Sequence, residues 1–362
     1  MHNRLTLSVL LVIGALLLGA CSGATPTVEP LPDPEPDPEA PAEQTFEGGE
    51  PATGSLVIYS GRSENLVAPI IDQFANATGI EVEVRYGSTS EMAATLLEEG
   101  ENSPADIFWA QDPGGLGAVA DAGLFTPLPE DLLSRVDARF ASPEGLWVGI
   151  SGRARVIVYN TDMLSEDELP TDLMAFTDPE WDGRIGLPPT NGSFQTMVTG
   201  LRAVWGEETT REWLEGIAAN NPSFYENNTA TVAAVGAGEV EVGFVNHYYL
   251  YRFLAEEGES FPARNYYLND GGPGSLVMVA GAGQLATSQN PENAQRFLDF
   301  LLSTVAQQYF ASQTYEYPLV DGVVTSSLLT PLSELNTPDI DLGDLSDLQG
   351  TVELLQDVGL LP

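Results

Sequence analysis

The first part of the chain that could fold alternates between short apolar runs and segments of helical spacing. The runs at 55–59, 80–86 and 105–110 are rich in β-branched and aromatic residues, whereas 67–74 and 92–97 carry apolar residues at helical spacing. The order strand, helix, strand, helix, strand predicts a mainly parallel sheet with right-handed crossovers and helices on both faces. This alternation indicates the α/β class.

A second unit of the same kind follows. It has predicted strands at 153–160, 185–188 and 240–245, and predicted helices at 193–205 and 208–219. An apolar strand at 275–280 could return the chain to the first unit, before helices at 291–303 and 345–358. We therefore expect two lobes with a ligand cleft between them: lobe 1 at 53–150, completed by about 275–325, and lobe 2 at 151–274, completed by about 326–362.

In sheets of this kind, ligands bind beyond the carboxyl ends of the strands. In the first lobe these ends are Ser60–Ser63, Gly87–Ser90 and Gln111–Gly115. A later segment, Gly281–Ala286, matches a dinucleotide-binding fingerprint in its residue pattern. Its glycines do not open a helix directly, so we assign them to a turn.

Charge and composition exclude several classes of function. The chain has 53 acidic and 13 basic residues and a formal charge of −40, which argues against a nucleic-acid partner because such binding uses cations to neutralise phosphates. All 13 basic residues are arginine. Schiff-base enzymes, Walker-A loops and Ser-Lys hydrolases all need a lysine, so they are excluded. After the first 20 residues the chain has one imidazole, His247, which is too few for a His-rich zinc site.

The first 20 residues read as an export signal, with Arg4 before an apolar run that is short for a membrane span. The run ends in Leu18-Gly19-Ala20-Cys21, which resembles the bacterial lipobox, so we expect Cys21 to be lipidated. The alternative is an ordinary signal followed by an incidental thiol. Cys21 is the single cysteine, which excludes an internal disulfide and suits a lipid anchor.

Residues 26–52 contain eight prolines and eight acidic residues. This composition predicts an extended linker rather than a packed domain. With the lipidated cysteine it forms the segment 21–52, which would hold the body near a membrane, in the periplasm or on the outer face of the cell.

Two adjacent phenols follow the predicted strand at 240–245, in the sequence Asn246-His247-Tyr248-Tyr249. On a continuing strand they would point to opposite faces, so both reach one point only if the backbone turns out of the sheet. A bound cation of high charge can displace a phenolic proton, and phenolate oxygen suits a hard ion such as ferric iron. The alternative is an aromatic helix face shared with Tyr251 and Phe253.

A second local feature, Thr190-Asn191-Gly192-Ser193-Phe194, stands immediately before a predicted helix. Free amides at a helix start bind small anions. A plain Asn or Ser cap with nothing bound is the alternative.

Taken together, these motifs resemble the ferric-iron-binding solute receptors of ABC importers, the bacterial transferrin-like family of periplasmic-binding-protein type II fold. The resemblance covers nearly everything from Ser55 to Pro362. It rests on Tyr59-Ser-Gly-Arg62, Ser103-Pro-Ala-Asp-Ile-Phe108, Ser151-Gly-Arg-Ala-Arg-Val156, Trp181-Asp-Gly-Arg-Ile-Gly186, Thr190-Asn-Gly-Ser-Phe194, Asn246-His-Tyr-Tyr249 and Asp344-Leu-Ser-Asp-Leu348.

The resemblance implies that two lobes close on one Fe³⁺ and that Tyr248 and Tyr249 supply phenolates. It also implies a synergistic anion, phosphate or carbonate, on the helix start. The residues implied for the anion are Asn191, Gly192 and Ser193, assisted by Asn228 and Asn246. By the same comparison His247 has a supporting or surface role rather than a ligand role.

The chain departs from the family pattern in its first lobe. Ser63 stands where one branch has a histidine ligand, and Gln111, followed by Asp112, stands where it has a glutamate ligand. Phe194 occupies a position at which another branch has a third tyrosine. Closure of the first lobe through Asp112, through Arg62 on the anion, or through water stays open, and weaker or exchangeable binding of iron follows as a hypothesis.

We therefore expect a monomeric, lipid-anchored extracytoplasmic receptor that delivers Fe³⁺ to an ABC permease and catalyses no reaction. One rival is the same fold binding a polyamine or an organic anion. The other is an exported hydrolase using Asp112 and Glu91 as paired carboxylates.

Overall fold

The computed structural model describes residues 53–361. The expected export signal, Cys21 and the linker lie outside these described residues. Every strand and both hydrophobic cores of the described part lie between Ser55 and Leu361, so a chain that begins at Thr53 keeps all of this fold.

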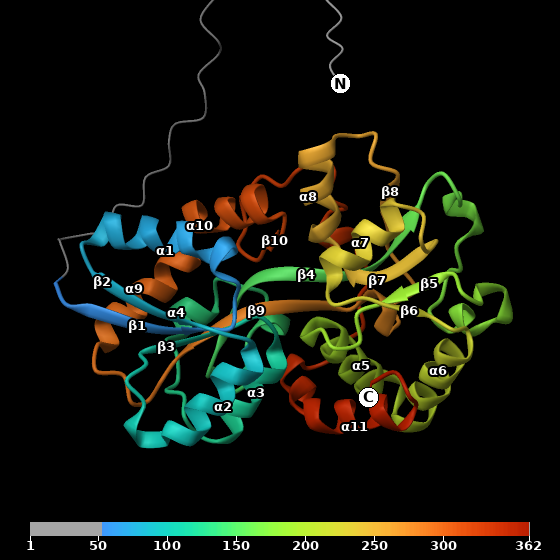
Figure 1. Ribbon diagram of the computed structural model, residues 1–362. Coiled ribbons are helices and arrows are strands. Elements are labelled where there is room, and N and C mark those ends of the chain that lie inside the picture. Colours follow the sequence, from blue (N-terminus) through green and yellow to red (C-terminus); the bar gives the residue numbers. More distant parts are fainter. Residues whose placement is uncertain (1–52, 362) are drawn as a thin grey trace, which may run out of the picture. The chain divides into compact units, whose positions relative to one another are not determined.

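One mixed sheet runs through the described part, with strand order β2-β1-β3-β9-β4-β7-β5-β6, and with β8 and β10 also pairing with β4 (Figure 1). The strands are β1 (Ser55–Ser60), β2 (Glu81–Tyr86), β3 (Ile107–Ala110), β4 (Val148–Asn160), β5 (Ile185–Leu187), β6 (Ser223–Phe224), β7 (Val242–Asn246), β8 (Ala263–Tyr266), β9 (Val277–Gln284) and β10 (Tyr317–Pro318).

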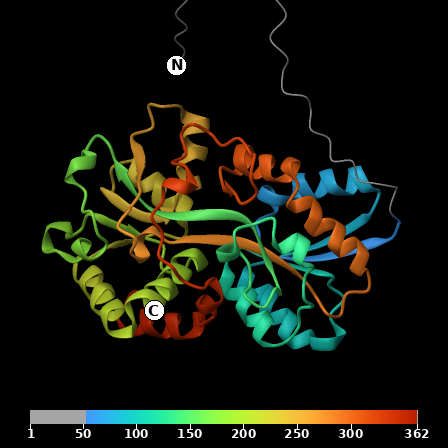
Figure 2. The same cartoon turned by 180° about the vertical axis from the view of Figure 1, so that it is seen from behind.

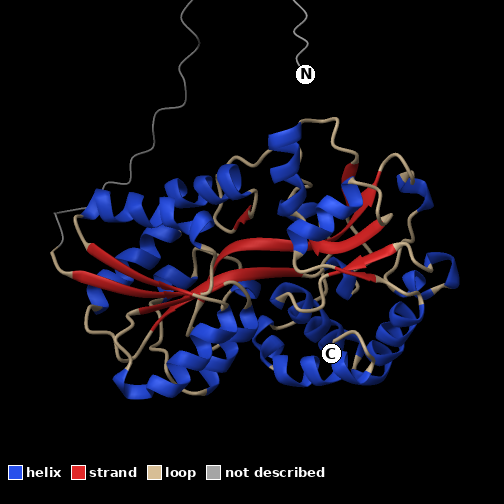
Figure 3. Cartoon of the chain, viewed as in Figure 1, coloured by secondary structure: helices blue, strands red, loops and turns tan. Residues whose placement is uncertain are grey.

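Helices cover both faces of the sheet, as Figure 3 shows with helices in blue and strands in red. The α-helices are α1 (Glu64–Thr78), α2 (Thr89–Glu99), α3 (Pro113–Asp121), α4 (Glu130–Leu133), α5 (Gly192–Trp205), α6 (Glu207–Ala219), α7 (Asn228–Gly236), α8 (Tyr248–Glu257), α9 (Pro291–Leu301), α10 (Thr304–Tyr309) and α11 (Leu348–Asp357). None of the helices in residues 53–361 combines the length and the apolarity that crossing a membrane requires.

The expected parallel pairing of the first three strands is confirmed, because β1 lies between β2 and β3 and runs parallel to both. Local signals set the element ends here. Gly79 closes α1 with a φ of 78°, and Ser88 and Glu91 form a capping box at the start of α2. Gly79 thus leads the chain directly into the start of β2, and the capping box fixes the short turn at the carboxyl end of β2.

The centre of the sheet is antiparallel, which the sequence prediction missed. β9 pairs antiparallel with both β3 and β4, and Figure 1 shows β4 and β9 as two long strands that extend through both halves of the molecule. Gly281 and Gly283 lie inside β9, so their assignment to a turn was wrong. A Cβ at Gly281 would lie 2.6 Å from the side chain of Leu116, and one at Gly283 equally close to Phe125, so the glycines permit close packing on the strand.

Two clusters of buried apolar residues fill the spaces between sheet and helices. The larger one contains residues of β1, β3 and β9, and the second is built around β5, α5 and α6. In the view from behind, the chain after β10 (orange to red) runs down the molecule to α11 (Figure 2). Its last part packs against α3 and α5, and so joins elements of both ends of the sheet.

Candidate functional site

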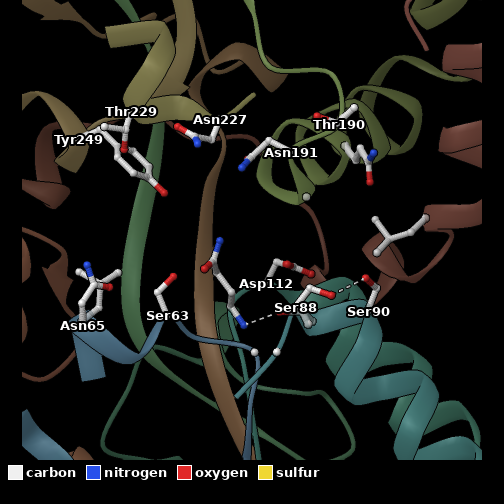
Figure 4. A pocket seen from close by; sticks show the side chains of 18 of the residues that line it. Ser63, Asn65, Ser88, Ser90, Asp112, Thr190, Asn191, Asn227, Thr229 and Tyr249 are labelled. Carbon is white, nitrogen blue, oxygen red and sulfur yellow. Dashed lines mark hydrogen bonds between the residues drawn. The ribbon is translucent and has the colours of Figure 1, made fainter. Parts of the chain in front are cut away.

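A cavity of about 640 Å³ opens at the strand ends that the sequence singled out. One side is formed by the turns after β1, β2 and β3, and the other by the starts of α5, α7 and α8 (Figure 4). The lining residues are Gly61, Ser63, Asn65, Leu66, Gly87, Ser88, Thr89, Ser90, Gln111, Asp112, Thr190, Asn191, Gly192, Gln195, Asn227, Thr229, Tyr249, Arg252 and Leu348. The turns at Ser60–Ser63, Gly87–Ser90 and Gln111–Gly115 therefore border one cavity, and the binding of a ligand there stays a prediction.

The tandem tyrosines begin helix α8 directly after β7. The backbone therefore turns out of the sheet here, which it must do if both hydroxyls are to reach the same point. Their rings stack, with centroids 4.3 Å apart and planes at 27°. Tyr249 lines the cavity and its hydroxyl points into it (Figure 4). Tyr248 is fully buried, and its hydroxyl has no hydrogen-bond partner.

An unpartnered buried phenol costs free energy, and such a group in a folded protein calls for an explanation. Burial, followed by the effects of Tyr249 and Glu316, raises the pKa of Tyr248 well above 10. The hydroxyl is therefore neutral in the empty protein. A cation would have to displace its proton to be bound by its oxygen.

His247 has a structural role. Its side chain is completely buried, its Nδ1 accepts a hydrogen bond from the Ala154 amide over 3.1 Å, and its Nε2 donates to the Tyr315 carbonyl over 2.9 Å. Burial lowers the pKa of His247 to about 3, so the ring is neutral at physiological pH. With both nitrogens engaged by the backbone, it supports the turn that carries Tyr248 and does not lie on the surface.

The start of α5 is held by a compact network of side chains. Asn191 is the N-cap, and its Oδ1 accepts hydrogen bonds from the amide of Ser193 over 3.1 Å and from its hydroxyl over 2.6 Å. Asn228 Nδ2 donates to Asn191 Oδ1 and to Ser193 Oγ, both over 3.0 Å, while its Oδ1 accepts from the amide of Asn246. The structure thus brings together four of the predicted anion-binding residues, and Gly192 lies between two of them.

Arg62, predicted to bind the anion, lies completely buried and donates to Glu316 over 2.7 Å. Glu316 also accepts hydrogen bonds from the hydroxyls of Ser151 and Thr314. Two guanidinium nitrogens of Arg62 have no partner, and the charge of Arg62 acts on both Tyr248 and Tyr249.

Two further arginines, Arg153 and Arg155, are buried on β4 beside the tyrosines. Arg155 donates to Asn246 Oδ1 over 2.9 Å, while Arg153 makes a long hydrogen bond of 3.4 Å to the Val279 carbonyl. Each keeps two nitrogens without a partner. Burial, together with repulsion from Arg153, lowers the pKa of Arg155 to about 9, so it still carries its charge near neutral pH.

The first lobe contributes mainly neutral groups. Ser63 and Gln111 line the cavity, and the amide of Gln111 donates to Thr89 Oγ1 over 2.9 Å. Asp112 is almost fully buried and caps α3. Burial raises the pKa of Asp112, against the opposing effect of Arg153. A Cβ placed on Gly192 would lie 4.0 Å from Asp112 Oδ2, so this carboxylate faces the start of α5 across the cavity.

Of the predicted metal-site residues, Tyr249, Gln111 and Asp112 line one cavity, and Tyr248 stacks on Tyr249. Among residues 53–361, no three His, Cys, Asp or Glu side chains converge to hold a metal. The paired-carboxylate rival finds no support in the geometry, because Asp112 is a helix cap and the exposed Glu91 belongs to the capping box of α2.

Sequence reasoning missed Arg153, Arg155 and Glu316. The two arginines carried a usable signal, since charged residues two apart on an otherwise apolar strand share one face of the sheet. Glu316 carried none, because its partner Arg62 is 254 residues away in the chain.

Comparison with known proteins agrees with this arrangement. The chain is similar to the Fe(3+)-binding periplasmic protein of Serratia marcescens, with 35% identity over 86% of this chain and 92% of that protein. It is 31% identical to the major ferric iron-binding protein of Neisseria meningitidis serogroup B, over 86% of this chain and 94% of the relative.

Solved structures agree with the fold. Iron-bound HitA from Pseudomonas aeruginosa superposes with a TM-score of 0.80 at 36% identity, over 84% of this chain and 99% of that one. FutA (IdiA) of Trichodesmium, in complex with iron and citrate ligands, gives a TM-score of 0.75 at 30% identity, over the same shares. These are two-lobed periplasmic binding proteins, so the expected fold class is confirmed. The model of the bacterial extracellular solute-binding proteins matches residues 102–338, and the chain belongs to that family.

Proposed function

We propose that this protein is an extracytoplasmic receptor that binds ferric iron between its lobes through the phenolate oxygens of Tyr248 and Tyr249. One observation carries the proposal: two stacked phenols meet at the cavity, and the hydroxyl of Tyr248 is buried without a partner. A hard trivalent ion would supply the missing partner. The relatives named for ferric iron binding support the same function.

The buried arginines support phenolate formation. A phenolate next to Arg62, Arg153 and Arg155 is stabilised by their charges, which a neutral phenol cannot use. When iron displaces the phenolic protons, the phenolate oxygens that remain are therefore stabilised by positive charges that are already in place. Removing either tyrosine leaves at most one phenolate for the ion.

A small oxygen-donor anion, such as phosphate or carbonate, would bind with the iron at the start of α5. The donors at this position are the amides of Gly192 and Ser193, the Ser193 hydroxyl, and the side-chain amides of Asn228 and Asn246. The two Ser193 donors and Asn228 Nδ2 already donate within the network that caps α5, so an anion would have to replace acceptors of that network. Asn246 Nδ2 is buried and lacks a partner, which favours an acceptor from outside the chain. On the first-lobe side, Asp112 and Gln111 are the candidate ligands, and Arg62 reaches the tyrosines from the same lobe.

We further propose that the lobes divide near residues 150 and 275 and close around the iron. A ligand favours the closed state only to the extent that it binds that state more tightly than the open one. A lipid on Cys21 would anchor the monomer, and an ABC permease would accept the iron from the closed form. The role is capture and delivery, with no reaction catalysed.

The test uses the soluble chain from Thr53 onward, freed of iron and mixed with ferric salt and bicarbonate or phosphate. A visible phenolate-to-iron charge-transfer band is expected, and Tyr248→Phe and Tyr249→Phe should each abolish or strongly weaken it. Tyr266→Phe is the matched control, because Tyr266 belongs to the other tandem pair and lies on β8, outside the cavity lining.

A band that survives both Tyr→Phe changes would refute the proposal. So would tight binding of a polyamine or a metal-free organic anion that displaces no iron, since the same cavity would then serve another solute.

A further inference from the structure

The backbone at Tyr315 has an unfavourable conformation. Its φ is 58° and its ψ is 24°, in the left-handed region that bulky residues rarely adopt. Among residues 53–361 one other non-glycine residue, Asn221, has a positive φ, and asparagine tolerates this region. A bulky residue keeps such a conformation only where the surrounding structure holds it, and residues of this kind cluster at functional sites.

The residues before Tyr315 hold it in this conformation. One turn of π-helix, Phe310–Thr314, comes directly before it, and such turns are frequent at functional sites. The amides of Tyr315 and Glu316 both donate to the Phe310 carbonyl, the second over 3.1 Å. The chain therefore leaves the helical turn in a fixed direction, and the backbone at Tyr315 leads it into β10.

The carbonyl of Tyr315 contacts the turn that carries the tandem tyrosines. It accepts a hydrogen bond from His247 Nε2 over 2.9 Å, while His247 Nδ1 accepts one from the Ala154 amide. The ring of Tyr317 stacks on the same imidazole, with centroids 4.6 Å apart. Because His247 immediately precedes Tyr248, the direction of this one carbonyl helps to set where α8 and its two phenols begin.

The residue after Tyr315 makes the contact with the turn that follows β1. Glu316 accepts a hydrogen bond from Arg62 over 2.7 Å, and it also accepts hydrogen bonds from the hydroxyls of Thr314 and Ser151. Two consecutive residues thus connect the tyrosine turn with the buried Arg62 guanidinium. The relative position of these two groups depends on the backbone at residue 315, and the ring of Tyr315 makes neither contact.

On the basis of the proposed function, we infer that Tyr315 is a positioning residue of the iron site and that it acts through its backbone. The left-handed conformation directs its carbonyl to His247 and the following carboxylate to Arg62. The phenols of Tyr248 and Tyr249 are thereby held beside the Arg62 charge before iron binds. Iron then meets a turn that is already ordered, which raises the affinity.

Two substitutions separate the backbone of Tyr315 from its ring. Tyr315→Gly and Tyr315→Ala both remove the ring, but glycine adopts a positive φ freely and alanine does not. The iron-free soluble chain from Thr53 is titrated with ferric salt and phosphate in competition with nitrilotriacetate, and the phenolate-to-iron band reports the bound iron. Tyr315→Gly should bind iron as the parent does, and Tyr315→Ala about tenfold more weakly, as the cost of one left-handed residue implies.

Asn221 supplies the matched control, because its φ is 45° and it does not line the cavity. Asn221→Gly and Asn221→Ala should differ in the midpoint of urea unfolding, as the two Tyr315 variants should, but they should bind iron with equal affinity. The control separates a positioning role from a general loss of stability.

A second measurement needs no iron. His247 is the single histidine of the chain from Thr53, so the proton on its Nε2 gives the one histidine N–H resonance of that chain. This proton should exchange slowly with water in the parent and in Tyr315→Gly, since it is buried and donates to a carbonyl. In Tyr315→Ala it should exchange faster.

Equal iron affinity of Tyr315→Ala and Tyr315→Gly would overturn the inference, whether both match the parent or both bind more weakly. Equal exchange rates of the His247 proton in the two variants would overturn it as well. If Tyr315→Ala does not fold, Tyr315→Gly still decides, because a loss of affinity there would assign the effect to the ring. A parent chain that forms no band with ferric salt would instead refute the proposed function, and the exchange rates would still test the positioning of His247.

Discussion

Arg62 donates a hydrogen bond to Glu316 over 2.7 Å, and both side chains are completely buried. The pair joins the turn after β1 to the residue before β10, and it lies beside Tyr248. The position of one charge next to the phenols therefore depends on a residue at the far end of the chain.

Glu316→Gln should destabilise the protein by about 3–5 kcal/mol, because it leaves the Arg62 guanidinium buried without its counter-charge. The measurement is the free energy of unfolding of the iron-free soluble chain in urea. Asp357→Asn removes one partner of the exposed pair with Arg211 and should cost about 1 kcal/mol or less. Equal losses of unfolding free energy in the two variants would show that the buried pair contributes no more to stability than the exposed pair.

Tyr248→Phe should cost no stability in the iron-free protein and is expected to increase it by about 1 kcal/mol. The substitution removes a buried hydroxyl that has no partner, while the ring that stacks on Tyr249 stays. Tyr251→Phe, on the same helix, is the control, since its hydroxyl donates to the Leu328 carbonyl over 2.9 Å and its loss should cost about 1 kcal/mol. Chemical denaturation of both variants decides the matter, and a clear loss of stability in Tyr248→Phe would mean that its hydroxyl is satisfied in the empty protein.

Acid should destabilise the iron-free chain through His247. Burial lowers the pKa of this ring from 6.5 to about 3. Below pH 6.5 the ring therefore takes up a proton in the unfolded chain but stays neutral in the folded chain. The stabilisation is complete above pH 6.5 and is lost as the pH falls. Between pH 7 and pH 5 the loss should amount to about 2 kcal/mol.

His247 is the single histidine of the soluble chain from Thr53. Burial also raises the pKa of Asp112, which acts on stability in the opposite direction as the pH falls. The contribution of His247 is therefore the difference between the parent chain and His247→Gln in urea unfolding at several pH values, and the parent chain should lose about 2 kcal/mol more than the variant between pH 7 and pH 5. Equal losses in the parent chain and in His247→Gln would contradict the assignment of a neutral buried ring.

Much of the fold could be predicted because local patterns and tertiary structure agree. The strand at 55–59 and the alternation at 80–86 became β1 and β2, and the motif before Phe194 became the start of α5. The turn at Asn246 could be placed because two adjacent phenols can serve one point only where a strand ends.

What could not be predicted depends on contacts between distant segments. The antiparallel centre of the sheet follows from the pairing of β9 with β3 and β4, and the glycines that permit it resemble turn glycines in the sequence. The ion pair of Arg62 with Glu316 likewise has no local signature, whereas Arg153 and Arg155 had one, two charges spaced two apart on an apolar strand, that the prediction did not use. The tyrosines were found because their chemistry is local, whereas the charges that tune them come from three separate strands or turns.

Asn191→Ala should separate the cap of α5 from its proposed role in anion binding. The substitution removes the acceptor of the Ser193 amide and hydroxyl, and it should cost about 1 kcal/mol of stability, as the loss of an N-cap does. Ser303→Ala removes the N-cap of α10, which does not line the cavity, and should cost a similar amount. Both costs are read from urea unfolding of the iron-free chain.

Iron titrations at increasing phosphate then distinguish the two variants. If the start of α5 holds the anion, Asn191→Ala alone should weaken the dependence of iron affinity on phosphate, because Ser193 and Asn228 lose the side chain that orients them. Equal phosphate dependence in both variants would place the anion elsewhere.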